Sequence, residues 1–141
     1  MIRLLTLVLK AQWRNLTVPK MFTATANRLP DKVMFYFEDQ TWTFRQIEDL
    51  SNRMANYFLS LNFTKGDSIA IFMENRPEFV ASWLGLAKIG VVPALINYNL
   101  KHDSLVHTVQ VAKCKAIIYG VELAQGNILT SIDHLHNKND T

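Results

Sequence analysis

The stretch from Gly66 to Asn97 constrains the fold most, because it predicts a strand, a helix and a second strand in succession. Residues 68–73 form a short apolar run bounded by turn residues, as expected for a strand buried on both faces of a parallel sheet. Residues 78–89 carry apolar side chains at spacings of three and four, which predicts a helix, and Gly90 can adopt the left-handed conformation that ends it. A second apolar run fills residues 91–96. This order predicts a right-handed parallel crossover, and therefore an α/β fold built on a partial parallel-sheet βαβ framework.

The residues before this helix predict how it begins. Asn75 can accept a main-chain N–H as an N-cap, and Glu78 stands three residues later, as in a capping box. Pro77 falls in the first turn, where its missing N–H costs nothing. We therefore expect Asn75 to cap the helix.

The segment before the crossover predicts a short helix and an N-terminal hairpin. Residues 18–27 are expected to form the helix, with Met21, Phe22 and Ala26 facing inward. Residues 33–37 form a wholly apolar strand, and residues 41–42 begin a returning strand after a polar turn.

A longer helix is predicted from residue 44 to 61. The sequence Thr43-Phe44-Arg45-Gln46 is a capping box at its start. Ser51 and Ala55 are small contact points within an apolar face formed by Phe44, Ile47, Leu50, Met54, Phe58 and Leu61.

The C-terminal third predicts one more helix and one more strand. Asn99 can cap a helix over residues 100–111, whose apolar side holds Leu105, Val109 and Ala112. Residues 116–119 form an apolar strand, and residues 125–141 are a polar tail expected to be frayed.

Positive charge is concentrated in the N-terminal leader. Residues 1–30 hold five basic residues and no acidic one, whereas residues 31–141 hold ten basic and twelve acidic residues. A nucleic-acid-binding domain requires a basic surface on its folded part, so no nucleic-acid partner is expected. Residues 1–16 form a basic amphipathic pattern with three interpretations: a helix in a membrane interface, a mitochondrial presequence, or a helix docked on the domain or left disordered.

The polar residues near the predicted strand ends do not assemble an active site. Residues 74–77 contain no glycine, which disfavours a phosphate-binding loop. Gly85 and Gly90 have the outer spacing of a phosphate loop, but Val91 stands where lysine is required. Glu74, Arg76 and Glu78 lie at the usual ligand-binding edge of a parallel sheet, where such residues more often cap and solvate a helix.

The remaining candidates for metal binding or nucleophilic chemistry are isolated. His102 and His107 are five residues apart, which does not place two ligands on one helix face, and His134 and His136 lie in the polar tail. Cys114 is the only cysteine, so no intrachain disulfide can form, and its place inside the apparent strand 114–119 favours a buried packing role over a nucleophile. We therefore expect no catalytic residue and no metal site.

Several strings of residues together resemble one family. They are Trp42-Thr43-Phe44-Arg45-Gln46, Ser51–Asn56, Gly66–Phe79, Trp83–Gly90 and Ala94–Leu100. This combination, within residues 17–123, resembles the fatty acid transport proteins, also called very-long-chain acyl-CoA synthetases, of the adenylate-forming superfamily.

The resemblance implies a two-step reaction for the full-length family. ATP and a long-chain fatty acid give an acyl-adenylate with magnesium, and CoA then takes the acyl group. In that family the phosphate loop, the nucleotide-binding motifs and the catalytic lysine all lie downstream of the segment that this chain resembles. We therefore expect an N-terminal fragment that is inactive alone and binds neither ATP, magnesium nor CoA.

The resemblance also divides the chain and suggests its location. Residues 1–16 are the leader, residues 17–124 the N-terminal part of an AMP-binding domain, and residues 125–141 the tail. The expected location is a membrane surface of the endoplasmic reticulum or plasma membrane, with the domain facing the cytosol. A mitochondrial location is less favoured.

Two further expectations concern partners and stability. The alternative function is a non-catalytic module that binds a membrane or a homologue. Open sheet edges predict self-association and a stability below the usual range of about 5–15 kcal/mol.

Overall fold

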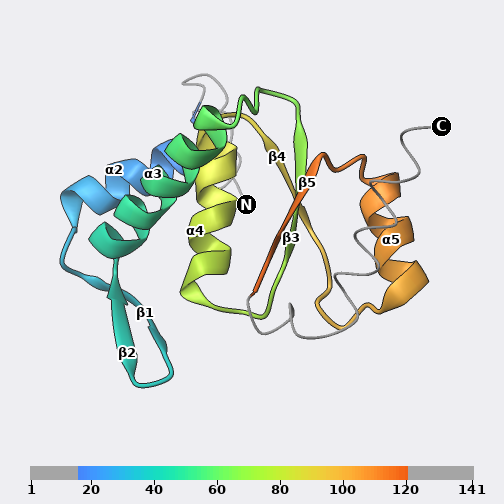
Figure 1. Ribbon diagram of the computed structural model, residues 1–141. Coiled ribbons are helices and arrows are strands. Elements are labelled where there is room, and N and C mark those ends of the chain that lie inside the picture. The colour runs from blue at the N-terminus through green and yellow to red at the C-terminus, as the bar shows by residue number, and fades with distance from the viewer. Residues whose placement is uncertain (1–15, 121–141) are drawn as a thin grey trace, which may run out of the picture.

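The computed structural model describes residues 16–120 (Figure 1). The predicted leader, except for Leu16, and the predicted tail lie outside these residues, so the structure does not test either segment. The elements in chain order are α2 (Val18–Arg28), β1 (Val33–Phe37), β2 (Gln40–Thr43), α3 (Phe44–Ser60), β3 (Ser68–Phe72), α4 (Pro77–Lys88), β4 (Val92–Leu95), α5 (His102–Val111) and β5 (Ala116–Tyr119).

The predicted parallel framework is confirmed. Strand β3 lies in the centre of a three-stranded sheet in the order β4-β3-β5. Both neighbours run parallel to it, with Ala70 opposite Ala94 on one side and opposite Ile117 on the other. Central placement explains the uninterrupted apolar sequence of β3, because its side chains from Ile69 to Phe72 are fully buried.

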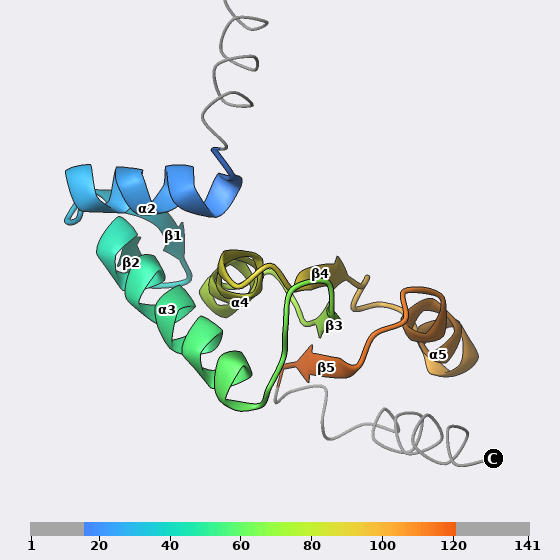
Figure 2. The same ribbon diagram turned by 90° about the horizontal axis from the view of Figure 1, so that it is seen from above.

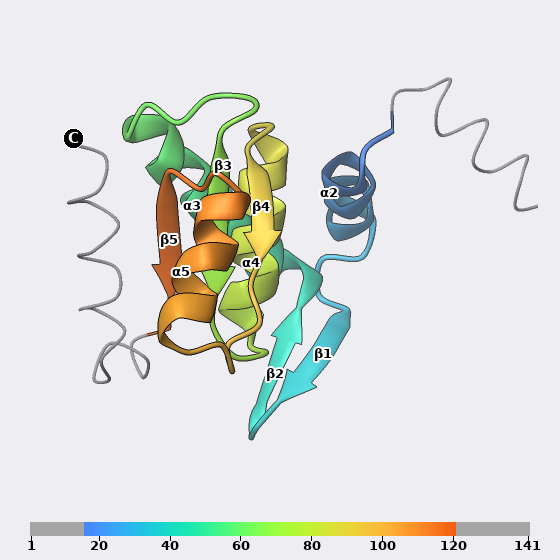
Figure 3. The ribbon, with the colours of Figure 1, turned by 90° about the vertical axis from the view of Figure 1, so that its right-hand side faces the viewer.

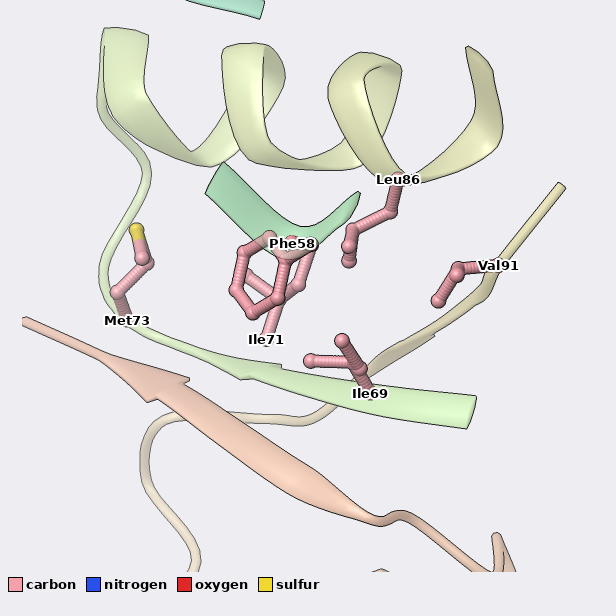
Figure 4. Packing of buried hydrophobic residues seen from close by; sticks show 6 residues of the cluster. All are labelled: Phe58, Ile69, Ile71, Met73, Leu86 and Val91. Atoms are coloured by element: carbon pink, nitrogen blue, oxygen red, sulfur yellow. The ribbon is translucent and has the colours of Figure 1, made fainter. Parts of the chain in front are cut away.

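Helices cover both faces of the sheet (Figure 2). Side chains alternate between the two faces of a strand, so Ile69 and Ile71 point to one face and Ala70 and Phe72 to the other. The first pair packs against α3 and α4 with Phe58, Met73, Leu86 and Val91 (Figure 4). The second pair packs against α5, where Leu105 and Val109 are buried as the sequence predicts.

Helix α4 begins one residue later than the predicted cap requires. Arg76, not Asn75, is the N-cap, and its side chain makes no capping hydrogen bond. The prediction for Asn75 was wrong because Pro77 sterically excludes the residue before it from the helical region. Arg76 is extended, with φ −156° and ψ 166°, so the first helical residue is Pro77 itself.

Helix α5 also begins later than predicted. Lys101 is its N-cap, and the proposed cap Asn99 lies two residues earlier. The Asn99 main-chain N–H donates to Asn97 Oδ1 at 3.0 Å. This local turn holds residues 97–99 outside the helix, because an Asx turn competes with helical hydrogen bonding.

Helix α3 confirms the predicted capping box. The main-chain N–H of Gln46 donates to Thr43 Oγ1 at 3.3 Å, and the Thr43 N–H donates to Gln46 Oε1 at 2.8 Å. Ser51, Ala55 and Phe58 are buried as expected. Leu61 is not, because it lies beyond the last helical residue, and it is largely exposed.

The hairpin of β1 and β2 is confirmed, and it projects away from the three-stranded sheet (Figure 3). Helix α2 follows the predicted span and buries Pro19 and Ala26. Met21 was predicted to face inward but is exposed. Residues 19, 22 and 26 share one helix face at spacings of three and four, and residue 21 lies off that face.

Two glycines with positive φ connect the entrance of β3 to the end of α4. Gly66 has φ +94° and Gly90 has φ +76°. The Gly66 N–H donates to the Gly90 carbonyl oxygen at 3.0 Å. The predicted left-handed conformation of Gly90 is therefore confirmed. The hydrogen bond holds the turn before β3 next to the turn between α4 and β4.

Candidate functional site

The candidate site is the edge of the sheet at which β3, β4 and β5 end, because ligands of open parallel sheets bind at this edge. Glu74 and Arg76 lie in the loop after β3, and Glu78 lies in the first turn of α4. Both glutamates are exposed and Arg76 is half-buried. The Glu78 carboxylate complements the positive end of the α4 helix dipole.

The loop after β4 lies at the same edge, since the strands are parallel. Asn97 Oδ1 accepts hydrogen bonds from the Asn99 N–H at 3.0 Å and from Asn99 Nδ2 at 3.2 Å. Tyr98 lies between them and is exposed. The two asparagines therefore stabilise the loop, and the edge presents the carboxylates of Glu74 and Glu78 and the phenol of Tyr98 to solvent.

The loop after β3 lacks the features of a cradle for nucleotide phosphates. Such a cradle needs consecutive main-chain N–H groups turned toward the anion, usually with glycine or with positive φ. Residues 73–76 contain neither glycine nor a residue with positive φ. Residues 73–76 therefore do not fit the ATP phosphates, and we assign no chemical step to them.

The other isolated candidates stay apart in the described part of the chain. His107 is exposed on α5, and no group of three or more His, Cys, Asp or Glu residues in this part is placed to hold a metal ion. Cys114 is half-buried, with its Sγ 3.5 Å from Ser68 Oγ. His134 and His136 lie outside the described residues.

Gly85 has a packing role that the sequence did not indicate. Its spacing with Gly90 resembled a phosphate loop only by chance. It lies in the middle of α4 and is buried against α3. The two glycines do not form a loop, because Gly85 is helical and Gly90 ends the helix.

A polar network that the sequence analysis missed joins α2, α3 and α4. Lys88 Nζ lies 2.9 Å from Glu48 Oε1, and both side chains are more than four-fifths buried. The same ammonium donates to Ser51 Oγ and Asn52 Oδ1, each at 2.7 Å. Thr23 Oγ1 on α2 donates to Glu48 Oε1 at 3.0 Å.

One sequence signal could have indicated this network. Glu48, Ser51 and Asn52 follow each other at helical spacings, and Glu48 lies next to the buried Ile47. A polar stripe beside the core-facing stripe indicates a buried polar partner. The partner lysine belongs to another helix, and the spacing within α3 does not identify it.

A second ion pair lies at the opposite edge of the sheet. Asp67 precedes β3, and its carboxylate contacts Lys115 Nζ, just before β5. Asp67 Oδ2 also accepts the Thr64 N–H at 2.8 Å. The hydrogen bond from Lys115, followed by the one from the Thr64 main chain, lowers the pKa of the Asp67 carboxyl below its ordinary value of 3.8.

A groove of about 350 Å³ runs between α2 and α4. It is lined by Thr17, Pro19, Lys20, Thr23, Ala24 and Asn27 from the α2 side and by Ala87 and Lys88 from α4. The Lys88 ammonium already has three close partners in the network. It is therefore not a free positive charge for a ligand in the groove.

None of the helices in residues 16–120 combines the length and the apolar character needed to cross a bilayer.

Comparisons with known proteins agree on a family. The sequence pattern of the AMP-binding enzyme family matches residues 22–140. Long-chain fatty acid transport protein 1 of Rattus norvegicus is 46% identical over 110 residues, which is 77% of this chain and 17% of that protein. Long-chain fatty acid transport protein 6 of Mus musculus is 35% identical over 127 residues, 89% of this chain and 20% of that protein. The chain therefore spans a fifth or less of the length of these relatives.

Solved structures show the same fold. The N-terminal domain of FACL13 from Mycobacterium tuberculosis has a TM-score of 0.72 at 29% identity, covering 84% of this chain and 29% of that one. The Klebsiella oxytoca NpsA N-terminal subdomain, in complex with anthranilyl-AMSN, has a TM-score of 0.69 at 28% identity, covering 72% and 27%. The matched region is less than a third of each of these two chains.

Proposed function

The chain belongs to the AMP-binding enzyme family, and from this premise we propose that it is the N-terminal portion of a long-chain fatty acid transport protein and acyl-CoA ligase. The observation that carries the proposal is the similarity to long-chain fatty acid transport proteins across most of this chain, at 46% identity to the rat protein. The parallel βαβ framework supports it, because solved N-terminal domains of this fold bind adenylate-like ligands, as the anthranilyl-AMSN complex of NpsA illustrates.

The proposed reaction of the whole protein is ATP-dependent formation of an acyl-adenylate, followed by transfer of the acyl group to CoA. The substrate is a long-chain or very-long-chain fatty acid. Within this scheme residues 16–120 supply the framework. The glycine-free segment 73–76 supports assigning ATP, magnesium and CoA binding to other parts of the whole protein.

The framework has a specific task under this proposal. Strand β3 is buried on both faces and fixes the position of the loops at the edge where the strands end. Glu74, Arg76 and Glu78 then form part of the wall of the site without touching the reacting atoms. Their role is to hold the entrance of α4 in place.

The proposed location is the surface of the endoplasmic reticulum or plasma membrane, with the domain facing the cytosol. Residues 1–16 are proposed to contribute to membrane contact through their basic amphipathic pattern. The alternative of a non-catalytic interaction module is not favoured by the comparisons, which name fatty acid transport proteins and an AMP-binding enzyme family.

Fatty-acid-dependent exchange of pyrophosphate into ATP tests the proposal. The 141-residue chain alone is expected to show no exchange, and robust exchange would overturn the assignment of the reacting groups to other parts of the protein. In a second arm, residues 16–120 replace the matching segment of the rat transport protein. Exchange that depends on a long-chain fatty acid supports the family role, and exchange with a short or aromatic acid in its place contradicts it.

A further inference from the structure

Strand β5 has an outer edge with which no strand of residues 16–120 pairs, because it is the last strand in the order β4-β3-β5. The Lys115 N–H donates to the Ser68 carbonyl oxygen at 2.8 Å, so this amide faces β3. Main-chain directions alternate along a strand, so the N–H and carbonyl groups of Ala116 and Ile118 face away from β3. These groups are therefore directed toward the position that an added strand would occupy.

The other edges of the described sheets have features that discourage strand addition. In β4, Pro93 has no N–H to donate to an added strand. In the ribbon of β1 and β2, the register is irregular between Val33 and Phe35, and such a bulge twists an edge away from a partner. Residues 116–119 of β5 contain neither proline nor a charged residue. Among the described strands, β5 therefore has the edge best suited to pairing.

The faces of the three-stranded sheet are already covered. Helices α3 and α4 lie on one face and α5 on the other, and none of these helices lies across the outer edge of β5 (Figures 2 and 3). The side chains of Ala116 and Ile118 pack on the α3 and α4 side, and Ile117 packs on the α5 side. A strand added at the edge of β5 leaves this packing in place. Association through the sheet is therefore confined to its edge.

The partner that fits this edge is the same edge of a second copy. When two β5 strands pair antiparallel around a two-fold axis, Ala116 of one copy lies opposite Ile118 of the other, and the two residues exchange main-chain hydrogen bonds. Ile117 then lies opposite its own equivalent, on the axis. A head-to-tail arrangement would instead use the β4 edge of the second copy, where Pro93 lacks the N–H. Pairing of β5 with β5 uses the same edge of both copies and closes at a dimer.

We propose that the 141-residue chain forms a two-fold dimer through antiparallel pairing of β5 with β5 of a second copy. The joined sheet has the order β4-β3-β5-β5-β3-β4, with helices on both faces. The proposal identifies one edge of the sheet, one orientation of the partner and one size of assembly. It does not depend on the proposed ligase activity.

Sedimentation equilibrium of the full chain over a concentration series tests the proposal. The wild-type chain is expected to follow a monomer–dimer equilibrium without larger species. Ala116→Pro removes an N–H that faces away from β3, at the first residue of β5, where proline is tolerated. The dimer then loses the same hydrogen bond from both copies, so dimerisation should weaken about tenfold. Ala116→Ser keeps the N–H and is the matched control, with dimerisation expected within about twofold of the wild-type chain.

A disulfide cross-link tests the register of the two strands. Ile117→Cys and Ile118→Cys are made separately in a Cys114→Ala background. Opposed residues without mutual hydrogen bonds in an antiparallel pair have Cα atoms about 4.5 Å apart, which a disulfide can span. Under mild oxidation the Ile117→Cys chain is therefore expected to form a covalent dimer. The Ile118→Cys chain is not, because its two thiols lie at offset positions along the strands.

Each result either supports the proposal or overturns it. A wild-type chain that stays monomeric throughout the series overturns it, as does equal dimerisation of the Ala116→Pro and Ala116→Ser chains. Dimerisation that is lost in Leu95→Lys but kept in Ala116→Pro would place the contact at β4. A covalent dimer of the Ile118→Cys chain, without one of the Ile117→Cys chain, contradicts the antiparallel register. Circular dichroism verifies that each variant is folded, and if one of the two experiments loses its variant to unfolding, the other decides.

Discussion

The Cβ atom that Gly85 lacks would lie 2.6 Å from the main-chain carbonyl oxygen of Ser51. It would also lie 2.9 Å from Met54 Cβ and 3.2 Å from the Ala55 main-chain nitrogen. Two of these atoms belong to the main chain of α3, which cannot move aside as a flexible side chain does. Gly85 therefore sets the distance at which α3 and α4 pack, and this contact supports the α3 and α4 side of the core.

Substituting Gly85 by alanine is expected to destabilise the domain by up to about 2 kcal/mol. Alanine favours an isolated helix by about 1 kcal/mol over glycine, but overpacking of a tight contact costs about 1–3 kcal/mol. The overpacking cost is expected to exceed the gain because the clash is with the main chain. Urea unfolding followed by circular dichroism measures the difference.

Asn56→Ala is the matched control for Gly85→Ala. Asn56 is exposed on α3, so alanine there improves helix propensity by about half a kcal/mol and meets no neighbour. An increase in stability at both positions would contradict the close-packing role of Gly85.

Lys88→Met is expected to destabilise the domain by about 2 kcal/mol. The substitution leaves the largely buried Glu48 carboxylate without its cationic partner, and an uncompensated buried charge is costly. The double variant Glu48→Met/Lys88→Met removes both charges and is expected to recover much of this loss. A double-mutant cycle in urea measures the coupling, and additive effects of the two substitutions would show that the ion pair contributes no stability.

Local signals predicted most of the fold. Thr43 and Gln46 form reciprocal hydrogen bonds within four residues, which identifies the start of α3. The spacing of apolar residues in α4 indicates a helix, and the apolar run of β3 indicates a buried strand. The failures at Asn75 and Asn99 arose where a stronger local constraint competed. Pro77 fixed the conformation of Arg76, and the side chain of Asn97 held Asn99 in a turn.

The two ion pairs that the sequence did not reveal lie outside the candidate site and depend on distant partners. Glu48 meets Lys88 only because α3 and α4 pack side by side, and Asp67 meets Lys115 only because β3 and β5 are neighbours. Hydrophobic periodicity predicts which face of each element is buried, but not which charged side chains on two elements end opposite each other.

Asp67→Asn is expected to lower the urea midpoint near neutral pH. The stability of this variant is also expected to depend less on pH in the acidic range than that of the wild-type chain. The folded state lowers the pKa of Asp67, so the unfolded chain binds the proton more tightly. The contribution of this carboxylate is therefore full above the ordinary value of 3.8 and is lost as the pH falls through the lower folded pKa.

Lys115→Met provides the companion measurement for Asp67→Asn. It removes the largest cause of the lowered pKa, so the stability of this variant should also vary less with pH below about pH 4. Urea midpoints measured at a series of acidic pH values decide the question. If the urea midpoints of both variants fall with decreasing pH as steeply as those of the wild-type chain, the Asp67–Lys115 pair does not cause the loss of stability in acid.

Pro93 limits strand addition at the outer edge of β4. The Val92 N–H donates to the Asp67 carbonyl oxygen and the Ile96 N–H to that of Ile71, both toward the β3 side. Because amide directions alternate along a strand, the main-chain nitrogens of Pro93 and Leu95 face away from β3, toward the side on which no strand of residues 16–120 pairs with β4. Proline has no N–H that could bond to an added strand there. The exposed apolar side chains of Val92 and Leu95, each more than half exposed, would otherwise favour such pairing.

Substituting Pro93 by valine is therefore expected to increase self-association. Valine restores an N–H at the open edge and favours the extended conformation, so the fraction of dimer and larger species at a given concentration should rise. Size-exclusion chromatography with light scattering measures this fraction over a concentration series. Adding Leu95→Lys to Pro93→Val places a charge beside the restored N–H and should reverse the increase. If the Pro93→Val chain associates no more than the wild-type chain, strand addition at β4 is not limited by this proline, and any self-association takes place through another surface.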